Sequence, residues 1–120
     1  MQSNKGRNII VDLSFEFALK IIKYAEELES GRKYIIARQL IRSGTGIGAN
    51  IREAQNAESR LDFIHKLKIA AKEADETEYW LLLCKNSEGF ASCEGLISDC
   101  NSIVKVLSKI IASSKSKRNN

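Results

Sequence analysis

Residues 42–80 read RSGTGIGANIREAQNAESRLDFIHKLKIAAKEADETEYW, and this stretch decides the fold. It joins a helix rich in small residues to a long amphipathic helix that carries acids, a tyrosine and a tryptophan. In both helices, inward positions alternate four and three residues apart, which is the spacing of helix-on-helix packing. The first stripe is Ile36, Leu40, Ser43, Ile47, Asn50, Ala54 and Ala57. The second is Phe63, Leu67, Ala70, Ala74, Thr77, Leu81 and Cys84.

Three glycines between Ser43 and Gly48 favour a loop, because each costs about 1 kcal/mol relative to alanine inside a helix. The stripe nevertheless keeps its phase across them, so we predict one continuous helix over about 34–57, with a loop as the alternative. If the next helix folds back, Ser43 and Gly44 lie opposite Ala74, and small residues meet. A buried Asn50 would need hydrogen-bond partners and could fix the register of the bundle.

Helical patterns also cover about 13–30, 60–86 and 94–112. The absence of proline supports a helical chain, since about six prolines would be expected at average usage. The sequence therefore predicts an all-α, antiparallel up-down four-helix bundle, formed by residues 1–120 as a single domain. We expect both termini, residues 1–11 and 113–120, to be frayed.

Residues that favour helix ends flank these segments. Asp12 or Ser14 would cap the start of the first helix, and Gly31 would take the C′ position after its end. Ser59 would cap the third helix, with Asp62 at N3 in a capping-box arrangement.

The 19 basic and 15 acidic residues give a net charge of +4. This makes a nucleic-acid partner conceivable, although most of these charges are expected simply to be solvated surface. Three cysteines without a CxxC pair argue against a disulfide framework and favour a reducing, cytoplasmic location. We expect no signal peptide and no contact with a membrane, because the chain lacks the required apolar runs.

Catalytic and cofactor motifs are incomplete. Gly44, Gly46 and Gly48 lack the spacing and the preceding strand of a dinucleotide-binding loop. His65 is the only histidine, so its spacing from Asp62 does not make a di-iron site. The acids of the third helix point around it in several directions and are interpreted as surface groups and salt-bridge partners. We therefore expect no metal, no cofactor and no enzymatic activity.

Several motifs resemble, in order and spacing, the proteins named after intervening sequences of bacterial 23S ribosomal RNA genes. These motifs are Arg42–Thr45, Ile47–Ile51 with Glu53 and Ala54, Asp62–Leu67, Ala71–Ala74 and Glu76–Leu81. The structural motif residues singled out within them are Ser43, Asn50, Glu53, Glu73, Glu76, Tyr79 and Trp80. The resemblance implies a homopentamer of four-helix bundles. It also implies a relationship to the accessory protein of diversity-generating retroelements, a basic barrel that binds nucleic acid and the reverse transcriptase. It implies no established activity.

An oligomer is also favoured by apolar residues that lie away from the seam. Ile69, Trp80 and Leu83 share such a face of the third helix, and the first helix is apolar over most of its circumference. Large apolar patches usually mark interfaces. The alternative is that Trp80 covers the bundle from the side.

The first functional hypothesis is therefore an oligomer that binds RNA or DNA through a basic surface. Arg38, Arg42 and Arg52 lie on one side of the second helix and could contact phosphates. Candidates that could add to them are Lys66, Lys68 and Lys72, with Lys115, Lys117 and Arg118 of the tail. Alternatively, the arginines form intersubunit salt bridges to acids of the third helix, and the protein is an interaction scaffold without nucleic acid.

Overall fold

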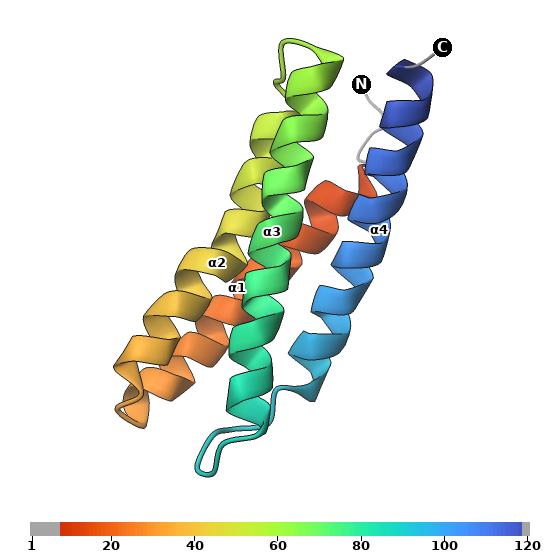
Figure 1. The fold of residues 1–120 in the computed structure, drawn as a ribbon. Helices are drawn as coiled ribbons and strands as arrows, with labels where there is room; N and C mark the ends of the chain where they lie inside the picture. Colours follow the sequence, from red (N-terminus) through yellow and green to blue (C-terminus); the bar gives the residue numbers. More distant parts are fainter. Residues whose placement is uncertain (1–7, 119–120) are drawn as a thin grey trace.

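Four helices make up the computed structural model, which describes residues 8–118. They are α1 (Ile9–Ser30), α2 (Tyr34–Ala54), α3 (Arg60–Lys85) and α4 (Glu94–Arg118). Consecutive helices run up and down beside one another (Figure 1). The predicted all-α, antiparallel four-helix bundle is thus confirmed. Residues 1–7 and 119–120, where fraying was also predicted, lie outside the described residues.

The outer helices are longer than predicted. α1 begins at Ile9 and α4 continues to Arg118, so the expected fraying of 9–11 and 113–118 is wrong. Ile10 and Ser114 are both buried, so the terminal turns contribute to the packed interior. Asp12 therefore lies in the first turn of α1, and neither it nor Ser14 is the N-cap.

The end of α1 differs from the prediction by one residue. Gly31 is the C-cap with φ −92°, whereas Arg32 takes the left-handed conformation with φ 65°. The Arg32 N–H donates to the Glu29 carbonyl (2.9 Å), and the Lys33 N–H donates to the Leu28 carbonyl (2.8 Å). These two bonds form a Schellman motif with arginine at the C′ position, where glycine is usual.

The start of α3 follows the prediction. Its N-cap is Ser59, whose Oγ accepts from the Asp62 N–H at 3.0 Å. The Asp62 carboxylate accepts from the Glu58 N–H (3.3 Å), one residue before the position that a capping box uses. α2 ends at Ala54, three residues earlier than predicted.

The continuous α2 through the glycines is confirmed, but its small residues serve two neighbours rather than one. A Cβ on Gly44 would lie 2.8 Å from Ile21 of α1, and one on Gly48 would lie 3.4 Å from Ser14 of α1. Only Gly46 faces α3, where a Cβ would lie 3.1 Å from Glu73. The glycines therefore chiefly permit the close approach of α1 to α2.

The polar contact between α2 and α3 is made by Ser43 and not by Asn50. The Thr77 hydroxyl donates to Ser43 Oγ at 2.8 Å, and both residues are fully buried. Asn50 is only partly buried, and its amide donates to the Gly46 carbonyl of its own helix (2.9 Å). The predicted register role of Asn50 is therefore wrong.

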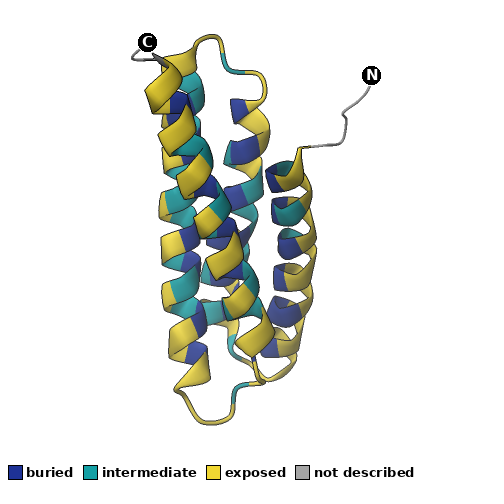
Figure 2. Cartoon of the chain, turned by 90° about the vertical axis from the view of Figure 1, so that its right-hand side faces the viewer, coloured by how far each residue is buried: buried dark blue, intermediate teal, exposed yellow. Residues whose placement is uncertain are grey.

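The core lies along the inner sides of the helices, as the burial colouring shows (Figure 2). The predicted α3 stripe is buried from Leu67 to Cys84, whereas Phe63 is half-buried and Ile64 takes the buried position. The largest apolar side chains of the core are Phe17, Ile21, Leu40, Ile47, Ile51, Leu67, Leu81, Ile103 and Leu107.

Candidate nucleic-acid interface

Arg42 of α2 is engaged by acids of α3 within the same chain. It forms an ion pair with Glu76, and its Nη1 lies 3.7 Å from Glu73 Oε1. The Gln39 side-chain oxygen also accepts from its guanidinium at 3.2 Å. Arg42 therefore has intramolecular partners, which differs from both the phosphate contact and the intersubunit bridge expected for it.

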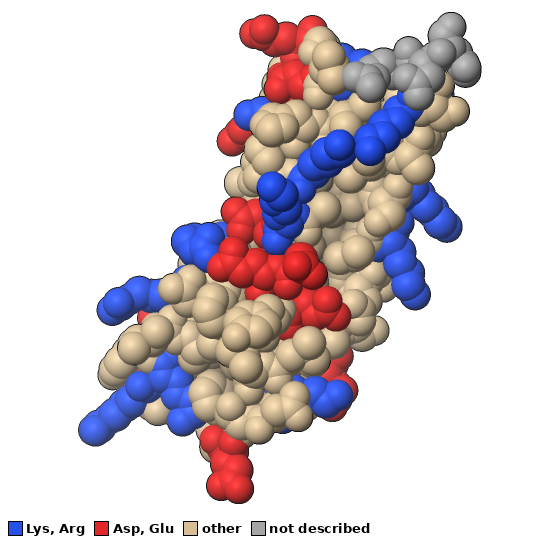
Figure 3. Space-filling view, viewed as in Figure 1, with Lys and Arg blue, Asp and Glu red and all other residues tan. Residues whose placement is uncertain are grey.

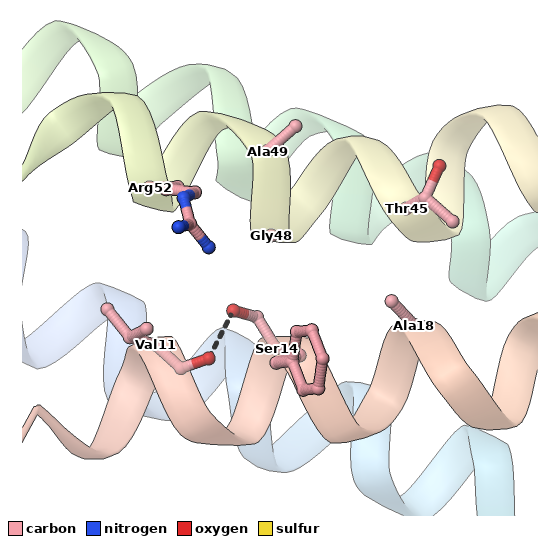
Figure 4. Close-up of a pocket in the computed structure, with 8 residues that line it drawn as sticks. Val11, Ser14, Ala18, Thr45, Gly48, Ala49 and Arg52 are labelled. Atoms are coloured by element: carbon pink, nitrogen blue, oxygen red, sulfur yellow. Dashed lines mark hydrogen bonds between the residues drawn. The ribbon is translucent and has the colours of Figure 1, made fainter. Parts of the chain in front are cut away.

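The structure does not bring the three arginines of α2 together. Arg38 is exposed on the first half of α2. Arg52 extends from α2 toward α1, beside Ser14 and Gly48 (Figure 4). Arg42 instead lies against α3. They share a helix but do not converge on one phosphate-sized site.

The predicted lysines of α3 also fall into different environments. Lys66 Nζ lies 3.0 Å from the Glu53 carboxylate, and this hydrogen bond raises the pKa of the lysine. Lys68 and Lys72 are exposed farther along α3.

A cleft lies where the start of α3 meets the end of α4, and we call it the basic cleft. Its volume is about 410 Å³. It is lined by Arg60, Phe63, Lys109, Ile110, Ser113, Ser114 and Lys117. Within residues 8–118, none of its three cations has a carboxylate partner within 4.0 Å, and its lining includes no acid. The cleft therefore presents three cations that no carboxylate of the described residues pairs with.

The sequence analysis did not predict Arg60 or Lys109 as phosphate contacts. It predicted Lys117 only as one of three basic residues near the C-terminus. The available signal was the four-residue spacing of Lys105, Lys109, Ser113 and Lys117, which places them along one side of a helix. The antiparallel order then brings the end of α4 beside the start of α3. In the space-filling view, basic side chains run diagonally over the upper part of the visible face, acids gather below them, and further acids lie at the upper end (Figure 3).

A second hollow lies at the opposite end of the bundle, and we call it the aromatic groove. Its volume is about 440 Å³, and it is lined by Arg32, Lys33, Tyr34, Ile35, Ile36, Gln39, Trp80 and Phe90. Trp80 is half-buried against the core, in agreement with the alternative that it covers the bundle from the side. Its Nε1 donates to Glu76 at 3.1 Å, and the Tyr79 ring meets it edge-on with centroids 5.2 Å apart.

The three cysteines are free and buried, as expected of small core residues. Burial raises the pKa of the Cys84 and Cys93 thiols. Burial also raises the pKa of Cys100 to about 12, and nearby negative charges, Glu78 first, add to the effect. None of these thiols is therefore prepared for nucleophilic chemistry.

No group of three or more potential metal ligands is arranged to hold an ion among the residues that the structure describes. In the same part of the chain, every helix is too short or too polar to cross a membrane.

Comparison with known proteins identifies the family. Residues 7–109 match the family model described as 23S rRNA-intervening sequence protein. A similar solved structure is a protein of unknown function from the S23 ribosomal protein family of Bacteroides thetaiotaomicron VPI-5482, determined at 1.70 Å. It is 47% identical and superposes with a TM-score of 0.82, covering 85% of this chain and 97% of the other. No curated protein matches the chain. The chain therefore belongs to the 23S rRNA-intervening sequence protein family.

Proposed function

We propose that this protein is a non-catalytic, self-associating bundle that binds RNA or DNA without sequence specificity through the basic cleft. The observation that carries the proposal is the set of three cations, Arg60, Lys109 and Lys117, around a cleft whose lining holds no acid. Phosphate groups are the ligands that such a set suits, and phosphate contacts fix position without reading sequence. Lys72 is also exposed farther along α3.

The composition of the cleft fits a nucleic-acid backbone. Ser113 and Ser114 line it with hydroxyl groups, which can donate to phosphate oxygens. Phe63 and Ile110 supply an apolar wall that sugar carbons could contact. Contacts of this kind to phosphate and sugar carry no sequence information, so the cleft favours affinity without sequence discrimination.

Self-association is supported by α1. Four apolar residues on this helix are between 39% and 65% exposed, namely Ile9, Phe15, Leu19 and Ile22. Beside them, the shallow groove of about 160 Å³ that Arg52 lines is otherwise built mainly of small residues of α1 and α2. An adjoining copy would cover this surface. The number five is an expectation from the family resemblance, and each added copy would present another basic cleft to the same nucleic acid.

The test is fluorescence anisotropy of a labelled single strand and a labelled duplex across a range of salt concentrations. Replacing all three cleft cations, as Arg60→Gln, Lys109→Gln and Lys117→Gln, should weaken binding broadly. Each lost phosphate contact should flatten the slope of log affinity against log salt by about 0.9 for duplex or about 0.7 for a single strand.

A matched variant removes the same charge from α2, as Arg38→Gln, Arg42→Gln and Arg52→Gln. It should retain more affinity than the cleft variant. If instead only the α2 variant loses binding, the site lies on α2 and the basic cleft is not used. Light scattering of each variant verifies that the mass of the assembly is unchanged.

A protein-interaction scaffold without nucleic acid is the second candidate, and the exposed apolar residues of α1 favour it. It predicts an assembly of defined mass that binds neither strand at low salt. Leu19→Glu should then dissociate the assembly, because it places a charge on the α1 face. Retention of the parental mass would place the interface elsewhere.

A further inference from the structure

The aromatic groove combines three aromatic side chains with two cations. Tyr34 comes from the start of α2, Trp80 from the end of α3 and Phe90 from the segment before α4. Its volume of about 440 Å³ lies within the range of small-molecule sites. Tyr34 is half exposed, so its ring is accessible from solvent.

The cations belong to the turn between α1 and α2. Lys33 Nζ lies 4.7 Å from the centroid of the Phe90 ring, so it forms a cation–π contact at the edge of the groove. Arg32 lines the groove from the C′ position of α1, with a left-handed φ of 65°. Glycine would adopt that backbone conformation at lower cost. The turn itself therefore does not require an arginine at this position.

The negative charge of Glu76, which lies beside the groove, is neutralised by a neighbouring arginine. Glu76 accepts from Trp80 Nε1 and is paired with Arg42, so its charge is offset and the tryptophan N–H is satisfied. No acid is among the lining residues that the structure describes. The groove therefore presents aromatic faces and net positive charge.

We propose that the aromatic groove binds an unpaired nucleobase of a single-stranded nucleic acid, with the adjacent phosphate held by Arg32 and Lys33. This inference rests on the proposed function and adds a preference for single strands to it. Aromatic side chains beside basic groups bind single strands because every base has a face that can stack. A duplex keeps its bases paired and cannot offer one.

Charge complementarity favours this occupant over a second copy of the chain. The protein carries a net charge of +4, so another copy offers no general electrostatic attraction for the two cations. A nucleotide supplies both a base that can stack on Tyr34 and Trp80 and a phosphate that can pair with Arg32 and Lys33 of the turn.

The experiment uses Trp80 as its own reporter, because it is the only tryptophan in the chain. The full-length protein is titrated with an unlabelled single strand and with a duplex of equal length, and emission is followed. Binding of each nucleic acid is measured separately by anisotropy. We expect the single strand to quench Trp80 and the duplex to leave its emission nearly unchanged.

Two variants and one control sharpen the test. Tyr34→Ala should lower affinity for the single strand about tenfold, the size of one lost stacking contact. Arg32→Gly should also weaken it while raising the melting temperature, so the loss cannot be attributed to misfolding. Arg38→Gln removes an exposed charge of the same helix outside the groove and should leave the quenching of Trp80 unchanged.

The outcomes separate the two proposals. If the single strand binds by anisotropy while Trp80 emission stays constant, the groove is not the site and only this inference fails. If neither nucleic acid binds, both proposals fail. If Trp80 emission changes with protein concentration but not with the strand, a second copy occupies the groove, and the inference is overturned.

Discussion

Gly44 and Gly48 of α2 offer a matched test of how closely α1 approaches, because the same substitution should have opposite effects one turn apart. Alanine at either position gains about 1 kcal/mol of helix propensity. A Cβ on Gly44 would lie 2.8, 3.0 and 3.3 Å from three carbons of Ile21. A Cβ on Gly48 would lie 3.4 Å from Ser14 Oγ and 3.5 Å from its carbonyl oxygen, which is ordinary van der Waals contact.

At Gly44, packing against Ile21 decides whether alanine raises or lowers the free energy of unfolding. Ile21 is fully buried, and the contacted atoms include its branched Cβ, so the side chain cannot turn away. Overpacking of a core costs about 1–3 kcal/mol. After the gain in propensity, Gly44→Ala should lose about 1 kcal/mol of unfolding free energy, while Gly48→Ala should gain about 1 kcal/mol. The difference of about 2 kcal/mol corresponds to roughly 8 °C in melting temperature.

The assay is urea and thermal unfolding followed by circular dichroism, at one protein concentration. Because Gly48 also lines the groove beside Arg52, light scattering must show that both variants keep the parental mass. Equal shifts in the same direction would refute the reasoning, since propensity alone would then account for both. A stabilised Gly44→Ala would mean that α1 can move away from α2 at little cost.

Three further expectations concern the α1 cap and the thiols. Gly31→Ala should stabilise the protein by about 0.4–1 kcal/mol in thermal unfolding, because φ −92° suits alanine and its Cβ would meet nothing closer than 3.5 Å. The three buried cysteines should resist iodoacetamide in the native state and react in urea, as measured by mass spectrometry; rapid native labelling would contradict their burial. The raised pKa of Cys100 implies stability that is complete below pH 9 and lost as the pH rises toward 12, because the unfolded thiol ionises first. Cys100→Ala should flatten this decline by up to about 1.4 kcal/mol per pH unit, and an unchanged slope would contradict the assignment.

The helices were predictable because periodicity records which side of each helix is buried. The same periodicity does not say which neighbour covers that side. The order of the helices along the chain predicts that Gly44 faces α3, whereas a Cβ on Gly44 would meet Ile21 of α1. The buried side of a helix in a bundle packs against two neighbouring helices. Which of the two a given residue contacts depends on the angles at which the helices cross, and these angles are not evident from the sequence.

The helix caps and the functional sites were less predictable from the sequence than the helices, because they depend on how the helices pack. Glycine next to a helix end suggests the C′ position, but the Schellman bonds place Arg32 there and make Gly31 the C-cap. The basic cleft joins Arg60 and Lys109, which are 49 positions apart, so no local motif reports it. The sequence predicts a phosphate contact for Arg42, but its ion pairs with the acids of α3 depend on how the two helices are rotated relative to each other, which the sequence does not show.

The aromatic groove lies beside the α1–α2 turn and the basic cleft at the start of α3 and the end of α4, and these segments are at opposite ends of the bundle (Figure 1). The longest dimension of the molecule is 51 Å. The sites are at most 51 Å apart, so even a fully stacked strand, at about 3.4 Å for each nucleotide, reaches both sites of one protomer with roughly 15 nucleotides. Binding at the second site is then intramolecular, so affinity should rise steeply as the strand approaches that length and level off beyond it. The Tyr34→Ala variant should lose this rise but keep the weak binding of short strands at the basic cleft. An affinity that does not rise between a few and roughly 15 nucleotides would mean that only one of the two sites binds.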